Sequence, residues 1–320
     1  ALAQRELAEK YYDNNQLTMA ADQYEKYIQN PNSFKRDKQR LVGLLFFAKR
    51  YNDSYDLASQ ILAEEPDNHY MQRLQFYNKK ALEEKDAAKA AAEKLFANPT
   101  AQLNSQDYIQ YGELLQDMGS DTLAVEMYEK AVAVSPEKTS LLKDLSAAYS
   151  SAKMYDKAAD TMAKYIDSEG ENADPNDMLS LANRYKNLAI ANLDTDSVAS
   201  AAAAAKALQT IDKVIARISD NPMVLNTKSD ILRIAARGAV TPDVVAADET
   251  TLAVLDADPS NATNERRIPI YRAVLGRLGN YYLTTAKDVE KAKLYFQKFY
   301  EVSPSDDLKA FIDGLDANAK

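Results

Sequence analysis

The chain has 320 residues and a formal net charge of −9, with 46% of its residues hydrophobic and 27% charged. Glycine accounts for 8 of the 320 residues, well below the roughly 7% of an average protein. Because sheets need many tight turns, which glycine favours, we expect helices joined by short loops. This apolar fraction excludes a disordered chain, and the negative charge disfavours nucleic acid and anionic membranes as partners.

Cysteine is absent, which excludes disulfide frameworks, thiolate metal sites and cysteine nucleophiles. The longest nearly unbroken apolar runs, residues 41–48 and 198–205, are far shorter than the roughly 20 residues that span a bilayer. We therefore expect no membrane span.

From the N-terminus onward, small and large side chains recur at a regular period. The first three units carry, in turn, Leu7, Ala8, Tyr11, Ala20, Tyr24, Tyr27 and Pro31; Leu41, Val42, Leu45, Ser54, Ala58, Ile61 and Pro66; and Met71, Leu74, Ala87, Ala91 and Pro99. Apolar residues at such spacings form one face of an amphipathic helix.

The fourth and fifth units show the pattern most clearly. They carry Tyr108, Tyr111, Gly112, Leu115, Ala124, Tyr128, Ala131 and Pro136, and then Leu142, Leu145, Ser146, Tyr149, Ala158, Met162 and Tyr165. Small residues next to large aromatic ones let two antiparallel helices approach closely while the rings fill the gaps.

Beyond a polar stretch at 168–178 the pattern loosens. A sixth unit is marked by Leu181, Ala182, Tyr185, Ala207, Ile211 and Val214, a seventh by Ile231, Ile234, Ala247, Val254 and Pro259, and an eighth by Leu278, Gly279, Tyr282, Ala292, Phe296, Phe299 and Pro304. An alanine-rich run lengthens the second helix of the sixth unit, and the seventh has a longer connection between its helices. A last helix over 306–315 places Leu308, Phe311, Ile312 and Leu315 against the eighth unit.

The residues of the fourth and fifth units resemble the tetratricopeptide repeat, whose pattern is W-x2-L-G-x2-Y, then A-x3-F, then P, over about 34 residues. Tyrosine replaces the tryptophan, and leucine replaces the last tyrosine. The resemblance implies an all-α, right-handed α-solenoid of about eight helix pairs with a C-terminal capping helix. One helix pair cannot bury its apolar face alone, so the units are expected to stack.

In this interpretation the domain organisation is one continuous solenoid. Residues 1–167 hold units one to five, 168–178 a longer connection, 179–304 units six to eight, and 305–320 the capping helix and tail. Helix starts are expected at Ser135-Pro136, Asp174-Pro175, Thr241-Pro242 and Ser303-Pro304, since each offers a capping residue followed by proline.

No pattern of catalytic residues is visible. The single histidine, His69, has no neighbouring partner of the type that a base or metal ligand needs, and common catalytic and phosphate-binding motifs are absent. We predict no catalytic site, no metal site, no cofactor and no enzymatic activity.

The resemblance places the inner wall of a groove on the first helix of each unit. The variable positions there supply the candidate partner-binding residues, which are Arg5, Tyr12, Gln39, Phe47, Gln72, Phe76, Lys79, Lys80 and Glu113. Tyr12, Phe47 and Phe76 are predicted as aromatic anchors, with Lys79 and Lys80 at an edge.

An alternative stays open for the apolar stretch around Phe47. Phe46 and Phe47 could instead wedge between neighbouring first helices, because residues 41–48 are apolar all round. Some family members clamp a terminal carboxylate with lysine, asparagine and arginine, but this sequence departs from that set in its first three units, so we expect no such clamp.

The leading hypothesis is a non-enzymatic scaffold that binds a protein or peptide in its groove, as a monomer or weak homo-oligomer. The alternative is a self-associating or envelope-linked structural spacer. The absence of cysteine and a first residue other than methionine favour a periplasmic or otherwise exported bacterial protein, with a cytoplasmic location as the alternative.

Overall fold

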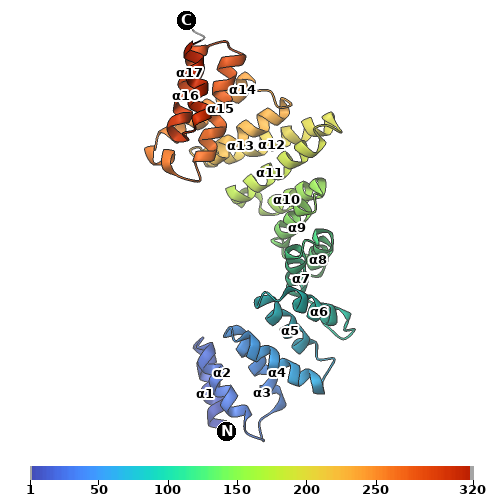
Figure 1. Ribbon diagram of the computed structural model, residues 1–320. Helices are drawn as coiled ribbons and strands as arrows, with labels where there is room; N and C mark the ends of the chain where they lie inside the picture. The colour runs from blue at the N-terminus through green and yellow to red at the C-terminus, as the bar shows by residue number, and fades with distance from the viewer. Residues whose placement is uncertain (1, 318–320) are drawn as a thin grey trace. The chain divides into compact units, whose positions relative to one another are not determined.

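The computed structural model describes residues 2–317, and in that range it contains helices and no strand. The helices follow one another in the predicted pairs (Figure 1). They are α1 (Leu2–Asp13), α2 (Leu17–Ile28), α3 (Lys35–Phe47), α4 (Tyr51–Glu64), α5 (His69–Ala81), α6 (Lys85–Ala97), α7 (Ser105–Asp117), α8 (Asp121–Val134), α9 (Leu141–Ser151), α10 (Tyr155–Glu169), α11 (Pro175–Asn192), α12 (Ser197–Arg217), α13 (Pro222–Ala235), α14 (Pro242–Asp256), α15 (Ile268–Thr284), α16 (Val289–Val302) and α17 (Asp306–Ala317), with short 3₁₀ helices η1 (Gly170–Asn172) and η2 (Pro259–Thr263). The predicted all-α solenoid of helix pairs is confirmed.

Small residues set the distance between paired helices. A Cβ added to Gly112 on α7 would lie 2.9 Å from the ring of Tyr128 on α8, and one added to Gly279 on α15 would lie 2.7 Å from the ring of Phe296 on α16. Ala20, Ala124 and Ala158 are likewise completely buried. The interlocking of small and large side chains predicted from the repeat is therefore present.

The turn inside each of the first three pairs has the same conformation. Asn15, Lys49 and Glu83, which recur at equal intervals along the chain, have φ values of 57°, 61° and 59°. In each turn the next backbone N–H reaches back across the helix end, as where Gln16 N donates to Tyr11 O at 2.8 Å. This is the hydrogen bond of a Schellman motif, which ends a helix sharply and lets the chain reverse.

Two of the four predicted helix starts are correct. Asp174 and Thr241 cap α11 and α14, each followed by proline. Ser135 and Ser303 instead close α8 and α16, so those two predictions are wrong. Because Asp174 accepts a hydrogen bond from Asn176 N at 2.7 Å, α11 begins inside the stretch 168–178 that was expected to be a connection.

The later pairs depart from the regular repeat as expected. The helix α12 extends over 21 residues and buries Ala203, Ala204 and Ala207. Residues 236–241 join α13 to α14, twice the length of the turn at 14–16 that joins α1 to α2. At the C-terminal end, Leu308, Ile312 and Leu315 of α17 pack with Ala292 and Phe296 of α16, so α17 caps the eighth pair.

The chain divides into two compact units, residues 1–152 and 153–320. Their boundary follows α9, inside the fifth predicted repeat unit. Continuity of the solenoid across this boundary stays a prediction.

Candidate functional site

One face of α3 is built from Arg40, Gly43 and Phe47, which are spaced as neighbours on a helix surface. Gly43 has no side chain, and Tyr70 at the start of α5 occupies the space above it. A Cβ on Gly43 would lie 2.8 Å from the hydroxyl oxygen of Tyr70. The glycine therefore allows a tyrosine from the next unit to lie across α3.

Tyr12 reaches the same face from α1. The guanidinium carbon of Arg40 lies 5.2 Å from the centre of the Tyr12 ring, within range of a cation–π contact. Tyr12 therefore contacts Arg40 and Tyr70 covers Gly43, and these two residues of α3 are one turn apart on the same face. Burial is the main cause that raises the pKa of Tyr70. Three successive first helices thus contribute to one surface.

Three of these side chains are open to solvent. Tyr12 is 42% exposed, Phe47 is 61% exposed and Tyr70 is 41% exposed. We call Tyr12, Arg40, Gly43, Phe47 and Tyr70 the aromatic patch. Exposed rings gathered from separate helices are unusual on a soluble surface and are typical of binding sites.

The two neighbouring phenylalanines of α3 have different environments. Phe46 is half-buried and packs against the core, with its ring centre 5.6 Å from that of Tyr51 and 6.1 Å from that of Tyr77. The alternative of a wedge between helices therefore describes Phe46, whereas Phe47 is at the surface.

Phe76 is not a surface anchor, and that prediction is wrong. Its side chain is completely buried, with ring centres 5.3 Å from Tyr77 and 6.1 Å from Tyr111. The repeat in this unit runs one residue later than expected, because Ala88 is buried and Ala87 is exposed. A shift of one residue moves the predicted outward positions Gln72 and Phe76 to Arg73 and Tyr77. Tyr70, one residue after the start of α5, is a further exposed ring that the repeat positions did not predict.

The remaining candidate residues already have partners within the chain. The pairs are Arg5 with Asp37 at 3.0 Å, Gln39 with Glu65 at 3.1 Å, Gln72 with the carbonyl of Pro66 at 2.9 Å, Lys79 with Glu84 at 2.7 Å, and Lys80 with Glu113. Lys79 and Lys80 are therefore not a free cationic edge.

Two Arg–Asp pairs at equivalent repeat positions join neighbouring first helices. Arg5 on α1 binds the buried Asp37 on α3, and Arg73 on α5 binds the buried Asp107 on α7. The hydrogen bonds to these aspartates are the largest cause that raises the pKa of both arginines. These pairs fix the helices on either side of the aromatic patch.

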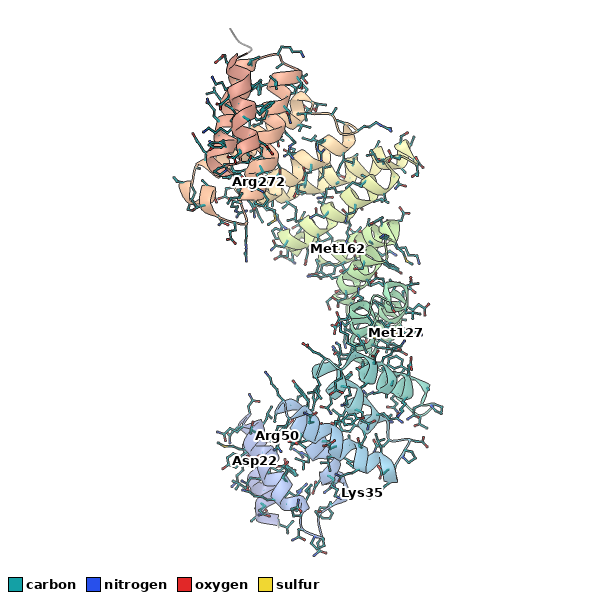
Figure 2. All side chains as sticks on the ribbon, viewed as in Figure 1. Asp22, Lys35, Arg50, Met127, Met162 and Arg272 are labelled. Carbon is teal, nitrogen blue, oxygen red and sulfur yellow. The ribbon has the colours of Figure 1, made fainter. Side chains whose placement is uncertain are left out.

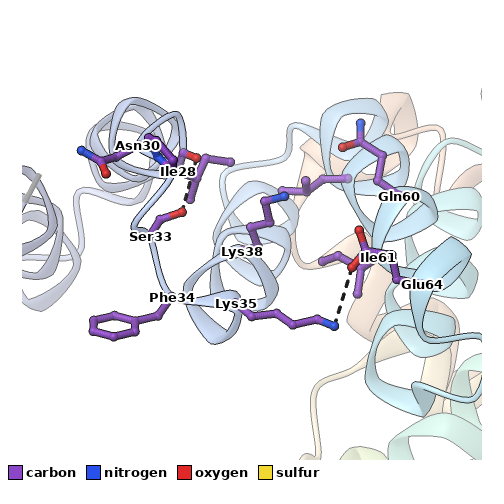
Figure 3. Close-up of a pocket in the computed structure, with 11 residues that line it drawn as sticks. Ile28, Asn30, Ser33, Phe34, Lys35, Lys38, Gln60, Ile61 and Glu64 are labelled. Atoms are coloured by element: carbon purple, nitrogen blue, oxygen red, sulfur yellow. Dashed lines mark hydrogen bonds and ion pairs between the residues drawn. The ribbon is translucent and has the colours of Figure 1, made fainter.

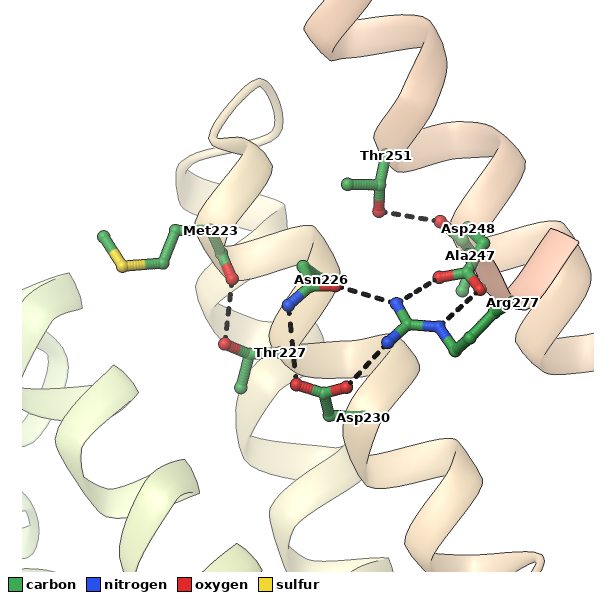
Figure 4. Close-up of polar contacts among 8 residues, drawn as sticks. All are labelled: Met223, Asn226, Thr227, Asp230, Ala247, Asp248, Thr251 and Arg277. Atoms are coloured by element: carbon green, nitrogen blue, oxygen red, sulfur yellow. Dashed lines mark hydrogen bonds and ion pairs between the residues drawn. The ribbon is translucent and has the colours of Figure 1, made fainter. Parts of the chain in front are cut away.

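Other ion pairs lie away from the patch. Arg50, at the turn before α4, is next to Asp22 of α2 in Figure 2 and binds it at 3.2 Å, while it also binds Glu25 at 2.7 Å. In the second compact unit Arg277 donates to Asp248 at 2.7 and 2.8 Å, to Asp230 at 3.1 Å and to Asn226 at 2.8 Å (Figure 4). This cluster joins α13, α14 and α15 through a largely buried guanidinium.

Hollows also lie elsewhere on the described residues. One, of about 300 Å³, has a mixed polar and apolar lining that includes Ile28, Ile61, Lys35 and Lys38 (Figure 3). Another, of about 500 Å³, lies among α12, α13 and α14, lined by residues that include Leu208 and Leu232. Among residues 2–317, every helix is too short or too polar to cross a bilayer.

No protein-family model matches the chain, and no curated protein matches its sequence. Its fold is similar to the crystal structure of the C-terminal part of a TPR repeat-containing protein from Cytophaga hutchinsonii, with a TM-score of 0.65 and 19% identity over 87% of this chain and 99% of that one. It is also similar to YrrB, described as a TPR protein with an unusual peptide-binding site, with a TM-score of 0.50 and 16% identity over 65% of this chain and 98% of that one.

Proposed function

We propose that this chain, which has the tetratricopeptide repeat fold, is a scaffold without catalytic activity of its own that holds a protein or peptide against the aromatic patch of α1, α3 and α5. The observation that carries the proposal is the exposure of Tyr12, Phe47 and Tyr70 on one surface supplied by three repeats. Aromatic side chains supply much of the binding energy at protein interfaces while losing little conformational entropy.

The surroundings of the patch favour a preformed surface. Arg5–Asp37 and Arg73–Asp107 join α1 to α3 and α5 to α7, so the helices that bear the rings are held in place before a partner arrives. A preorganised surface loses less entropy on binding than a mobile one. A peptide partner is also the kind of ligand named for YrrB, one of the proteins of similar fold.

The test compares two triple variants with the wild-type protein on an array of short synthetic peptides of random sequence. Tyr12→Ala/Phe47→Ala/Tyr70→Ala removes the three rings of the patch. The matched control, Met19→Ala/Leu123→Ala/Leu294→Ala, removes three apolar side chains of 51%, 47% and 66% exposure from other surfaces. Circular dichroism and urea unfolding establish that both variants are folded.

We expect the peptides that bind wild type to bind the control equally and the patch variant about tenfold more weakly or worse, since hot-spot side chains each contribute more than about 1 kcal/mol. Equal binding by all three proteins would show that the patch is not the binding site.

A further inference from the structure

Charged side chains around the aromatic patch are already neutralised within the chain. Arg40 binds Glu9 at 2.5 Å while its guanidinium lies against the Tyr12 ring. Arg5 and Arg73 bind Asp37 and Asp107. An acidic partner would have to take these cations from their carboxylates, and a basic partner would have to displace Arg40 from Tyr12.

The exposed charges that remain on these first helices have both signs. They include Glu6, Lys10 and Asp13 on α1 and Arg36 and Lys38 on α3, all open to solvent. Such a mixture attracts neither an acidic nor a basic segment strongly, and salt screens exposed charges over about 10 Å at ordinary ionic strength.

The hydroxyl groups of the patch differ from those of the core. The buried Tyr24 and Tyr271 and the half-buried Tyr77 donate to Glu9, Asp256 and Asp107, respectively. Tyr12 and Tyr70, in contrast, have no hydrogen-bond partner among the described residues. Two phenol donors therefore remain available above the α3 face, where the carbonyl groups of a bound peptide backbone can accept from them.

We propose that the aromatic patch selects an uncharged, apolar peptide segment, with the rings of Tyr12, Phe47 and Tyr70 contacting its side chains and the two tyrosine hydroxyls donating to its backbone carbonyls. This inference rests on the proposed function and specifies the chemistry of the partner. Ion pairing contributes little to this recognition, because Arg5, Arg40 and Arg73 are occupied within the chain and the remaining exposed charges have both signs.

The experiment uses three series of short peptides, acetylated and amidated at their ends and matched in apolar content. One series is uncharged, one contains aspartate and one contains lysine. Dissociation constants are measured at low and high sodium chloride for the wild type, for Tyr12→Phe/Tyr70→Phe, which retains the rings without the hydroxyls, and for Tyr12→Ala/Phe47→Ala/Tyr70→Ala.

We expect the uncharged series to bind best, with less than about a twofold change in Kd between the two salt concentrations. We expect the Phe/Phe variant to bind about tenfold more weakly, the effect of two ordinary hydrogen bonds. A preference for either charged series with steep salt dependence, or unchanged binding by the Phe/Phe variant, would overturn this inference. If the alanine variant still loses binding in that case, the proposed function stands; if it binds every series as well as wild type does, both proposals are wrong.

Discussion

The guanidinium of Arg73 donates two hydrogen bonds to the buried carboxylate of Asp107, at 2.6 and 2.8 Å. The same carboxylate accepts from the Tyr77 hydroxyl at 2.8 Å and from Asn104 N at 2.9 Å. Asp107 thus joins α5 to α7 and also completes the capping box that begins α7. A single side chain stabilises both the local helix and the stacking of two repeats.

Asp107→Ala is expected to lower the free energy of unfolding by about 3–5 kcal/mol, because Arg73 is left as an uncompensated, largely buried charge. Glu113→Ala is the matched control. It removes the half-exposed partner of Lys80 and should cost less than about 1 kcal/mol. Urea unfolding measures the free energy of unfolding of both variants. Equal losses would show that the buried Asp107 ion pair stabilises the fold no more than the exposed Glu113 pair does.

Glycines at two kinds of site should respond differently to alanine. Gly112→Ala places a Cβ 2.9 Å from the packed ring of Tyr128 and should destabilise by about 1–3 kcal/mol. Gly43→Ala meets only the far end of Tyr70, which can move, and it gains up to about 1 kcal/mol of helix propensity.

Thermal and urea unfolding of the two variants check this contrast. We also expect Gly43→Ala to weaken peptide binding, since the Tyr70 phenol is displaced from its place over α3. A strongly destabilised Gly43→Ala protein would contradict the placement of Tyr70 on an open surface.

The turns with positive φ offer a stabilising substitution. Lys49 and Glu83 adopt the left-handed conformation, which costs an L-residue about 1–2 kcal/mol relative to glycine. Lys49→Gly should therefore raise the free energy of unfolding by about 0.5–1 kcal/mol after the greater entropy of unfolded glycine is deducted. The reverse change, Gly119→Ala at φ 74°, should lower it. If Lys49→Gly lowered the free energy of unfolding instead, the Lys49 side chain would make a stabilising contact that outweighs the backbone effect.

Buried tyrosines limit the stability of the fold at alkaline pH. Burial raises the pKa of Tyr149, Tyr271 and Tyr295 to about 12, whereas an unfolded tyrosine ionises near 10. A raised pKa contributes stability that is fully present below about pH 10 and is lost as pH rises toward 12.

Ultraviolet titration of phenolate should therefore show late ionisation for part of the 20 tyrosines, accompanied by falling urea midpoints above about pH 10. The substitution Tyr271→Phe should remove part of this dependence. Ionisation of all tyrosines in one step near pH 10, with constant midpoints, would contradict the burial of these phenols.

The repeat itself was predictable because the residues at its small positions differ strongly in size from their neighbours in the sequence. Gly112, Ala124 and Ala158 stand out among large and charged neighbours, and each is buried against the partner helix. The eight helix pairs and the capping helix follow from the regular spacing of these small residues.

The register of the third unit was not predictable by the same reasoning. Residues 87, 88, 90, 91 and 92 are all alanine, so hydrophobic periodicity in α6 cannot separate the buried from the exposed face. Ala88 follows Ser54 by one full repeat, and the register that it sets replaces Phe76 with Tyr77 as the outward position. In the seventh unit the predicted small residue Ala247 is half-buried, and its neighbour Asp248 is completely buried against Arg277 instead. No hydrophobic pattern marks a buried aspartate.

Tyr12 and Phe47 were identifiable as positions on the first helices, but the pairing of the charges around them was not. Arg40 with Glu9 and Arg73 with Asp107 are far apart along the chain, and only stacking of the repeats brings them together. The sequence consequently pointed to a cationic edge at Lys79 and Lys80 that internal ion pairs remove.

Hydrogen exchange of backbone amides tests the central claim most directly. Wild-type protein is compared with and without saturating amounts of a short uncharged peptide that the patch variant fails to bind. We predict slowed exchange in α1, α3 and α5 around Tyr12, Gly43 and Tyr70, with α12, α13 and α14 unchanged. Slowed exchange confined to α12–α14, or to the hollow beside Lys38, would contradict the assignment of the aromatic patch as the partner-binding surface.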